Sequence, residues 1–312
     1  MIGVDWGTSS LRAWRMDPRT GAALDARSVP GGGILSVPAG GFPDALRAAI
    51  GDWLAEGESE VLMCGMVGSR QGWVEVPYLP LPAGAAEIAA ALTEVGGFDP
   101  AARVRVVPGL TGRDASGVPE VMRGEETKLV ALLSEAAESG SGAGAVVCMP
   151  GTHCKWARAE GGRVASFATH MTGEVYAALS GHTILARTLD ADAPLDGSAF
   201  DEGLARAATP GGPLHHLFGV RTRALLDGLG PAASASYLSG LLIGHELRAA
   251  LDGVAEGAEV RLVGAGALVE RYGRAIAAAG RRVLARGEEA AARGLYLLWR
   301  AASDARAEAA AA

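Results

Sequence analysis

Long hydrophobic runs and an excess of basic residues are both absent from this 312-residue sequence. No stretch reaches the ~18 uninterrupted apolar residues of a membrane-spanning helix. The first residues also lack the basic start, apolar stretch and cleavage site of a signal peptide, so we expect a cytoplasmic protein. The formal net charge of −7 argues against nucleic acid as a partner, because binding to a phosphate backbone needs a basic surface.

Cysteine is scarce, and so is lysine. The three cysteines, Cys64, Cys148 and Cys154, are odd in number, which in a reducing compartment indicates buried thiols and not a disulfide framework. None of their spacings is Cys-x2-Cys, so a zinc site is poorly supported. Two lysines, Lys128 and Lys155, stand among 28 basic residues, and this bias towards arginine draws attention to each of them.

Several familiar nucleotide-binding motifs are missing as well. The sequence contains no Gly-x4-Gly-Lys-[Ser/Thr] and therefore no P-loop. The glycine-rich segment 264–266 continues to Ala267, where ribokinase-type enzymes carry Asp, and Val269 stands where a dinucleotide-binding fold needs a third small residue. Phosphate binding must therefore be sought in other loops.

The length favours two domains, because a single hydrophobic core stops growing beyond about 250–300 residues. A strand–loop–strand unit occurs at 2–16 and again at 145–159, with Gly151 placed 144 positions after Gly7. The Ser- and Gly-rich segment 139–144 indicates a flexible joint. We expect an α/β protein of two similar halves that present their loops to one ligand cleft.

Hydrophobic periodicity predicts alternating strands and helices along the chain. Besides the two repeated units, strands are expected at 22–29, 60–64, 104–107, 163–169, 260–263 and 282–284. Helices are expected at 43–54, 85–95, 124–137, 268–279 and 288–302, with mostly helical sequence up to about 251 and an alanine-rich end that frays.

The first loop, Asp5-Trp6-Gly7-Thr8-Ser9-Ser10, follows a strand with a carboxylate, a glycine and three hydroxyl groups. Successive N–H groups and hydroxyls can surround phosphate oxygens. Asp5 is a candidate ligand of Mg²⁺, held through water because Mg²⁺ dehydrates reluctantly. A hairpin with a glycine turn and solvated hydroxyls is the alternative. The candidate phosphate-binding residues here are Gly7, Thr8, Ser9 and Ser10.

The second loop, from Pro150 to Lys155, repeats the Gly-Thr turn between two strands. Gly151 and Thr152 are candidate phosphate-binding residues. The ammonium of Lys155 can approach a phosphate as a compact point charge, which the bulky planar guanidinium of arginine cannot do. A surface lysine on a strand is the alternative.

A third loop breaks a strand into a helix at Gly264, Ala265 and Gly266. Its glycines indicate a close approach of the backbone to something flat, such as a nucleotide base and ribose. A plain helix start fits the same residues.

Adjacent carboxylates, Glu125 and Glu126, begin a predicted helix after Gly124. One of them could accept the proton of an attacking hydroxyl as a general base. The alternative is that both complement the helix dipole. Consecutive helical residues point about 100° apart, so one of the pair at most faces a given substrate.

A glycine-rich polar loop follows the strand at 60–64 and extends to Trp73. Its backbone at Gly68 and Ser69 suits a polyol, and the guanidinium of Arg70 or of Arg123 could bind a carboxylate. The candidate substrate-binding residues are Gly68, Ser69, Arg70, Trp73 and Arg123. An ordinary surface turn is the alternative for the loop.

The order of these loops resembles the phosphate 1, phosphate 2 and adenosine motifs of the sugar kinase/actin/heat-shock-protein superfamily. Six blocks that run in order along the chain resemble the 2-dehydro-3-deoxygalactonokinase family more closely. They lie at 65–69, 77–83, 121–127, 149–156, 171–174 and 238–244.

This resemblance implies two ribonuclease H-like (actin-like ATPase) domains with a cleft between them, at 1–127 and 128–312, the last helix packing back on the first domain. It implies ATP and Mg²⁺ as cofactors. It also implies phosphorylation of the 6-hydroxyl of 2-dehydro-3-deoxy-D-galactonate in galactonate degradation. The partners implied are the sugar acid and ATP, with a homodimer possible and no membrane or nucleic acid.

Comparison with the glycerol and xylulose kinases sharpens the choice of base. Their catalytic Asp lies shortly before phosphate 2, which makes Glu125 the base here and Glu126 the fallback. Relatives often carry an acid where this chain has Pro150, so the metal is left with Asp5 as its carboxylate anchor.

Two other functions stay open. A kinase for another 2-keto-3-deoxy sugar acid or for a hexose would use the same machinery. An actin-like or chaperone-like ATP switch would keep the nucleotide loops, but the chain lacks an extra peptide-binding domain. Glu125 and the polar loop at 64–73 suit a small polyol better.

Overall fold

The computed structural model describes residues 1–138, 144–264, 266–287 and 289–311. Contacts divide the chain into two compact units. Unit 1 comprises Met1–Ala145, Ala157–Phe167 and Glu288–Ala312, and unit 2 comprises Val146–Trp156 and Ala168–Gly287. The predicted domain boundary after residue 127 lies inside a helix, α3 (Glu125–Glu138), and the assignment of domains stays a prediction.

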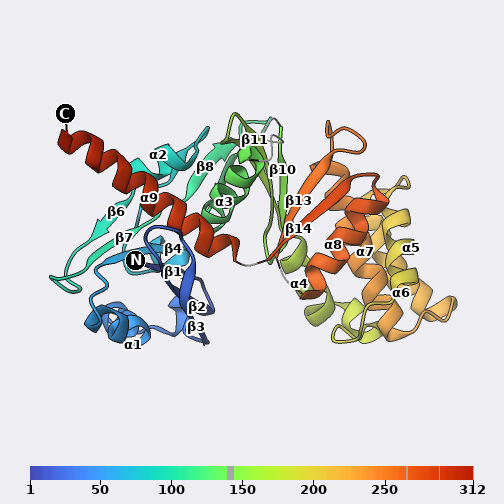
Figure 1. Cartoon of the computed structure of the whole chain (residues 1–312). Coiled ribbons are helices and arrows are strands. Elements are labelled where there is room, and N and C mark those ends of the chain that lie inside the picture. The colour runs from blue at the N-terminus through green and yellow to red at the C-terminus, as the bar shows by residue number, and fades with distance from the viewer. Residues whose placement is uncertain (139–143, 265, 288, 312) are drawn as a thin grey trace. The chain divides into compact units, whose positions relative to one another are not determined.

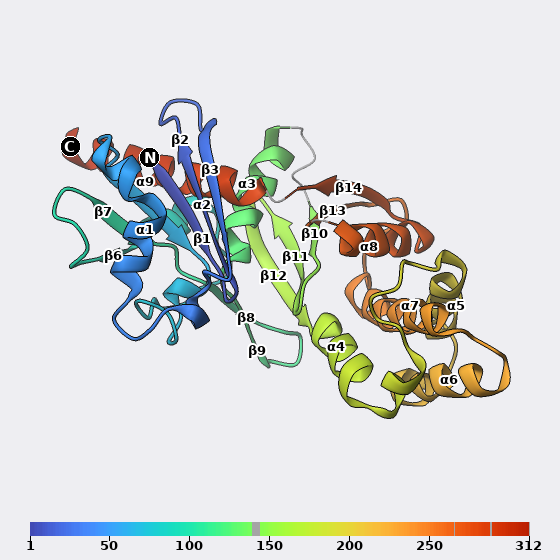
Figure 2. The ribbon, with the colours of Figure 1, turned by 90° about the horizontal axis from the view of Figure 1, so that it is seen from below.

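Unit 1 is built on a six-stranded sheet in the order β3-β2-β1-β4-β7-β6. The central strand β1 pairs antiparallel with β2 and parallel with β4. Figure 2 shows β1, β2 and β3 side by side. The strands are β1 (Ile2–Trp6), β2 (Ser10–Met16), β3 (Ala23–Pro30), β4 (Glu60–Cys64), β6 (Thr93–Val95) and β7 (Arg103–Val106).

Helices cover both faces of this sheet, as the alternation of side chains along β1 requires. Ile2, Val4 and Trp6 belong to a core shared with helix α1 (Phe42–Ala55). Gly3, which faces the other way, lies against Leu295 of helix α9 (Ala290–Ala311). Figure 1 shows α9 running past α2 (Ala85–Ala90) and α3, and it contacts both.

Close packing of α9 on α3 depends on a glycine. A Cβ on Gly294 would lie 1.8 Å from the carbonyl oxygen of Thr127. Only a residue without a side chain allows this approach. The first turn of α3, which carries Glu125 and Glu126, is thereby fixed against α9.

A three-stranded sheet in the order β5-β8-β9 also belongs to unit 1. Short 3-10 turns η1 and η2 follow β3 and β4. These elements were not predicted, because strands of two to four residues show too little alternation to be recognised. Their bounds are β5 (Leu79–Pro80), β8 (Leu110–Arg113), β9 (Pro119–Met122), η1 (Ile34–Ser36) and η2 (Met66–Gly68).

The second large sheet has the order β12-β11-β10-β13-β14. Strand β13 lies between β10 and β14 and is parallel to both. Helices α7 (Pro231–Ala250) and α8 (Gly266–Ala278) contribute the apolar residues that pack on β10 and β13. The strands are β10 (Val146–Met149), β11 (Cys154–Glu160), β12 (Arg163–His170), β13 (Glu259–Val263) and β14 (Arg282–Arg286).

Helix α7 is the central helix of unit 2, with 14 of its 20 residues buried. Gly240 and Gly244 let α5 approach it closely, since a Cβ on Gly240 would lie 2.0 Å from the carbonyl oxygen of Phe200. The glycines of the block at 238–244 therefore have a packing reason. The remaining elements of unit 2 are α4 (Thr172–His182), η3 (Ile184–Thr188), α5 (Gly197–Ala207), α6 (Gly212–Leu226), α7 (Pro231–Ala250) and α8 (Gly266–Ala278).

Two predicted elements were wrong in extent. The helix expected at 85–95 ends at Ala90, and Thr93–Val95 forms β6 on the edge of the sheet. The last helix continues to Ala311, beyond the predicted end at 302, in keeping with the high helix propensity of alanine. None of the described helices has the length and apolar character needed to cross a membrane.

Candidate functional site

The first glycine-threonine loop joins β1 to β2 in unit 1. The N–H of Gly7 donates to the carbonyl of Ser10 at 3.0 Å, and Thr8 and Ser9 are exposed. Turn η1 supports the loop from one side. A Cβ on Gly33 would lie 2.3 Å from the carbonyl oxygen of Thr8, so a glycine is needed there. The loop presents its polar groups outward on a fixed backbone.

Asp5 lies at the end of β1, next to two backbone segments with glycines. Its Oδ2 accepts a hydrogen bond from Arg12 Nη2 at 3.0 Å, and 14% of its side chain is exposed. A Cβ on Gly65, at the end of β4, would lie 3.2 Å from Asp5 Oδ1. The Cβ position of Gly124 is 3.3 Å from Cα of Gly65. Both glycines have positive φ, +93° and +107°, so the three segments meet only because glycine stands at both positions.

The two adjacent glutamates occupy different environments. Glu126 is fully buried, and its Oε2 accepts the N–H of Gly124 at 2.6 Å. Burial, followed by repulsion from Glu125, raises the pKa of Glu126 to about 8, so this acid is largely protonated at neutral pH. Glu125 is half-buried and accepts the N–H of Arg123 at 3.1 Å. Of the two, Glu125 is the one within reach of a bound molecule.

The polar loop after β4 contains one exposed arginine and one packed aromatic ring. Arg70 is 88% exposed and lies 3.9 Å from Glu75. The hydroxyl of Ser69 donates to the carbonyl of Met66, and Gly68 is buried. Trp73 stacks on Phe42 with ring centroids 6.4 Å apart, at the border of the core. Trp73 therefore packs the loop onto α1.

Arg123 is held under the same loop. Its Nη2 donates to the carbonyl of Val76 at 2.6 Å, and its guanidinium lies 4.3 Å from the ring centroid of Tyr78. Its Nε and Nη1 are enclosed and have no hydrogen-bond partner among the described residues. A Cβ on Gly68 would lie 3.0 Å from Nη1, so the absence of a side chain at Gly68 makes room for this cation.

The second glycine-threonine loop joins β10 to β11 and rests on helix α4. The N–H of Glu174 donates to the carbonyl of Thr152 at 3.0 Å, and His153 Nε2 lies 2.6 Å from Glu174 Oε2. A Cβ on Gly173 would lie 2.4 Å from the carbonyl oxygen of Gly151. The first turn of α4 therefore fixes the loop. In the sequence, the block at 171–174 carries no local signal of this supporting role.

Lys155 lies beneath this loop, at the start of β11. Its side chain is almost fully buried, and Nζ donates to the carbonyl of His153 at 3.2 Å. A buried ammonium strengthens any electrostatic interaction at the loop, because the surroundings screen charge poorly.

A cavity of about 280 Å³ opens beside the second loop within unit 2. Beside it, Glu246 accepts hydrogen bonds from Trp156 Nε1 at 2.6 Å and from the Tyr272 hydroxyl at 2.7 Å. These bonds join β11, α7 and α8 next to the cavity, because Tyr272 is one of its lining residues. The lining residues are Gly151, Thr152, Thr172, Gly173, Tyr176, Ala177, Ser239, Leu242, Ile243, Leu268, Arg271 and Tyr272.

The predicted adenosine loop leads directly into one wall of this cavity. Gly264 follows β13, and Gly266, with φ of +61°, begins α8. Ala265 lies outside the described residues. Two turns of α8 then place Leu268, Arg271 and Tyr272 in the lining. The glycine-rich loop itself is at the entrance to α8 and is not among the lining residues.

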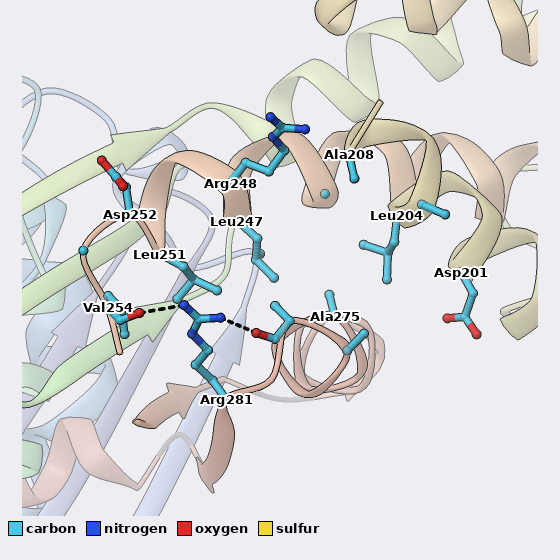
Figure 3. Close-up of a pocket in the computed structure, with 15 residues that line it drawn as sticks. Asp201, Leu204, Ala208, Leu247, Arg248, Leu251, Asp252, Val254, Ala275 and Arg281 are labelled. Atoms are coloured by element: carbon cyan, nitrogen blue, oxygen red, sulfur yellow. Dashed lines mark hydrogen bonds between the residues drawn. The ribbon is translucent and has the colours of Figure 1, made fainter. Parts of the chain in front are cut away.

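A larger cavity in unit 2, of about 730 Å³, contains none of the predicted site residues. Figure 3 shows it between α5, α7 and α8, with the side chains of Leu204, Leu247 and Ala275 around it. Both Nη atoms of Arg281 bind backbone carbonyls at its edge. Its walls are mainly apolar, and no phosphate loop borders it, so we place the candidate site elsewhere.

Within the described ranges, no cluster of three or more His, Cys, Asp or Glu side chains is arranged to hold a metal ion. Asp5 nevertheless fits a role as a single carboxylate ligand. Its Oδ2 makes the Arg12 contact, and its Oδ1 is the oxygen next to Gly65. Mg²⁺ commonly takes one or two carboxylates and fills its other positions with phosphate oxygens and water.

Two loops with N–H groups and hydroxyls, a half-buried glutamate and an α/β frame suit a kinase of small molecules, and the comparisons with known proteins give that class. Residues 5–298 match the family model described as 2-keto-3-deoxy-galactonokinase. The chain belongs to this family.

Individual relatives agree with the family model. The chain is 36% identical to the Escherichia coli (strain K12) 2-dehydro-3-deoxygalactonokinase, over 89% of each protein. It is 40% identical to a Rhizobium meliloti (strain 1021) protein named as a probable 2-dehydro-3-deoxygalactonokinase, over 88% of this chain and 87% of that one. A crystal structure of a Sinorhizobium meliloti protein assigned to the same activity matches with a TM-score of 0.87 at 39% identity. That match covers 96% of this chain and 98% of the other.

Proposed function

We propose that the protein transfers the γ-phosphoryl group of ATP to the 6-hydroxyl of 2-dehydro-3-deoxy-D-galactonate. The product is 2-dehydro-3-deoxy-6-phospho-D-galactonate, an intermediate of galactonate degradation. The observation that carries this conclusion is the family match over residues 5–298. The relatives' names supply the substrate, and the site residues supply the chemistry.

Glu125 is the general base in this proposal. Its half-buried carboxylate accepts a backbone N–H at one oxygen, which restricts its rotation. Accepting the proton of the 6-hydroxyl makes that oxygen a better nucleophile for the γ-phosphorus. The neighbouring Glu126 is enclosed and protonated, which supports the choice of Glu125.

The two glycine-threonine loops bind the phosphates in this proposal. Gly7, Thr8, Ser9 and Ser10 offer N–H and hydroxyl donors. Gly151 and Thr152 do the same, and the ammonium of Lys155 neutralises charge that develops on the transferred group. Mg²⁺, held by Asp5 through water, would supply further charge neutralisation.

The sugar acid binds at the loop after β4 in this proposal, with backbone contacts at Gly68 and Ser69. An arginine is required for its carboxylate, because bidentate pairing rejects uncharged sugars. Arg70 is exposed and free to turn towards a ligand. Arg123 lies over the Tyr78 ring with its Nε and Nη1 enclosed, which suits a supporting role under the loop. Trp73 contributes by holding the loop on the core.

Gly264, Ala265 and Gly266 are proposed to contact the adenosine part of ATP. We propose ATP and a sugar acid alone as binding partners, without nucleic acid or membrane. We also propose that the protein acts in the cytoplasm and that it is a homodimer. Light scattering on the purified protein at several concentrations tests that assembly. A monomer at all concentrations would remove the homodimer from the proposal.

An assay of the purified protein with ATP, Mg²⁺ and a panel of sugar acids and hexoses tests the activity. We expect turnover of 2-dehydro-3-deoxygalactonate to exceed that of its gluconate epimer and of uncharged hexoses. Preference for another 2-keto-3-deoxy acid would keep the kinase class and change the substrate. ATP hydrolysis that no sugar acid affects, together with filament formation, would instead indicate an actin-like switch.

A further inference from the structure

Helix α8 presents two arginines one turn apart with different surroundings. Arg274 forms a two-pronged pair with Asp201, through Nε and Nη2 at 2.6 Å each. Arg271 lines the 280 Å³ cavity beside the second loop, and its Nε is enclosed without a hydrogen-bond partner among the residues that the structure describes. One arginine of the pair is thus satisfied by protein, and the other faces a cavity.

The surroundings of Arg271 offer it little compensation. Its side chain is half-buried, and a charge removed from water is costly unless it is paired. Tyr176 is in the same lining. Burial raises the pKa of its hydroxyl, the charge of Arg271 opposes that rise, and the charges of Asp192 and Asp190 add to it. Tyr176 is therefore a neutral phenol and does not neutralise Arg271. The cavity therefore contains a planar cation that suits a bound ligand.

The shape and chemistry of the lining indicate which ligand. Leu242, Ile243 and Leu268 form apolar walls, and Gly151 and Thr152 lie in the same lining. A volume of about 280 Å³ is near the lower end for small-ligand pockets, ~300 Å³, and is suited to a nucleoside. Apolar walls beside a planar cation favour a flat aromatic ring, because a guanidinium stacks on the face of an aromatic ring.

We propose that Arg271 stacks on the adenine base of ATP and so orients the nucleotide with its phosphates towards Gly151 and Thr152. This inference rests on the proposed function, in that ATP is the nucleotide bound beside the second loop. It adds a base-recognition residue that lies a turn beyond the glycine-rich loop.

Calorimetric binding without sugar acid tests the proposal, with ADP and inorganic tripolyphosphate as the two probes. In Arg271→Leu, we expect the Kd of ADP to rise about tenfold, which is ~1.4 kcal/mol and within the range of a desolvated cation–π contact. The Kd of tripolyphosphate should stay within twofold, because it has no base. Arg271→Lys should recover part of the loss.

Arg274→Leu is the matched control, because it removes an exposed arginine from the same helix. The ion pair with Asp201 that is lost lies at the surface and contributes little to stability. It should leave both Kd values unchanged, and thermal melts should show that all variants fold. Equal weakening of tripolyphosphate in Arg271→Leu would assign Arg271 to phosphate and overturn the stacking proposal. Unchanged ADP binding would overturn it too. Failure of the sugar-acid assay with normal ADP binding would reject the proposed function alone.

Discussion

The two glycine-threonine loops look alike in sequence but are supported and charged differently. Loop 7–10 is supported by turn η1, about 25 residues later in the chain, where Gly33 meets the carbonyl of Thr8. Loop 150–153 is supported by a helix about 20 residues later, where Gly173 meets the carbonyl of Gly151. The strand before the first loop carries a carboxylate, Asp5, as its next-to-last residue, and the strand after the second carries an ammonium, Lys155, as its second residue.

This difference shows that a repeated backbone motif can be adapted to opposite charges. A carboxylate suits a hydrated divalent cation, and an ammonium suits phosphate oxygens. The shared Gly-Thr turn then supplies only N–H and hydroxyl donors. If this division of roles is right, substitutions in the two loops should produce different kinds of loss.

The largest effect is expected next to the first loop, at Glu125. Glu125→Gln removes the base without changing size, and we expect kcat to fall about 10²–10⁴-fold while ADP binding by calorimetry is kept. The matched control is Glu126→Gln. Glu126 is largely protonated at neutral pH, so the amide of glutamine is a close mimic of this neutral acid. The kcat of Glu126→Gln should therefore change less than threefold. The reverse pattern would make Glu126 the base.

A smaller effect is expected from the two loop charges. Lys155→Met should lower kcat about 10²–10³-fold, the usual loss for one group that stabilises transition-state charge, with an unchanged Mg²⁺ requirement. Asp5→Asn should instead raise the Mg²⁺ concentration at half-maximal rate. Initial rates across a Mg²⁺ titration distinguish the two variants. The same Mg²⁺ dependence in both would remove the proposed division of roles.

The smallest effect concerns the supports of the loops. Gly173→Ala and Gly33→Ala each place a methyl group against backbone, and we expect each to cost about 1–3 kcal/mol of unfolding free energy, measured by urea denaturation. Gly151→Ala is the control, because its Cβ would meet nothing within 4 Å. A Gly151 variant as unstable as the Gly173 variant would show that loop 150–153 is not fixed by α4.

Much of the frame could be predicted from sequence. Strand β1 (Ile2–Trp6) and the repeated Gly-Thr turns stand out because buried strands and tight turns leave local patterns. The helix predicted at 85–95 was too long because the alanines of this segment favour a helix. Thr93–Val95 instead pairs with β7 and forms a strand of the sheet. That pairing is a tertiary effect, which overrides local propensity.

The site was less predictable than the frame. The candidate residues near each loop could be named, since their chemistry is local. The contact of Gly173 with Gly151, the enclosure of Arg123 and the place of Arg271 in the cavity could not, because each depends on elements far apart in the chain. The difference between Glu125 and Glu126 also had to come from burial.

The enclosure of Glu126 also makes folding a proton-uptake reaction. The folded pKa of about 8 lies above the ordinary glutamate value of 4.5, so between these pH values the native chain holds a proton that the unfolded chain releases. The resulting stability is fully present below pH 4.5 and is lost as the pH rises through about 8. Unfolding at pH 7 should therefore show a calorimetric enthalpy that varies with the ionisation enthalpy of the buffer, and Glu126→Gln should reduce that variation.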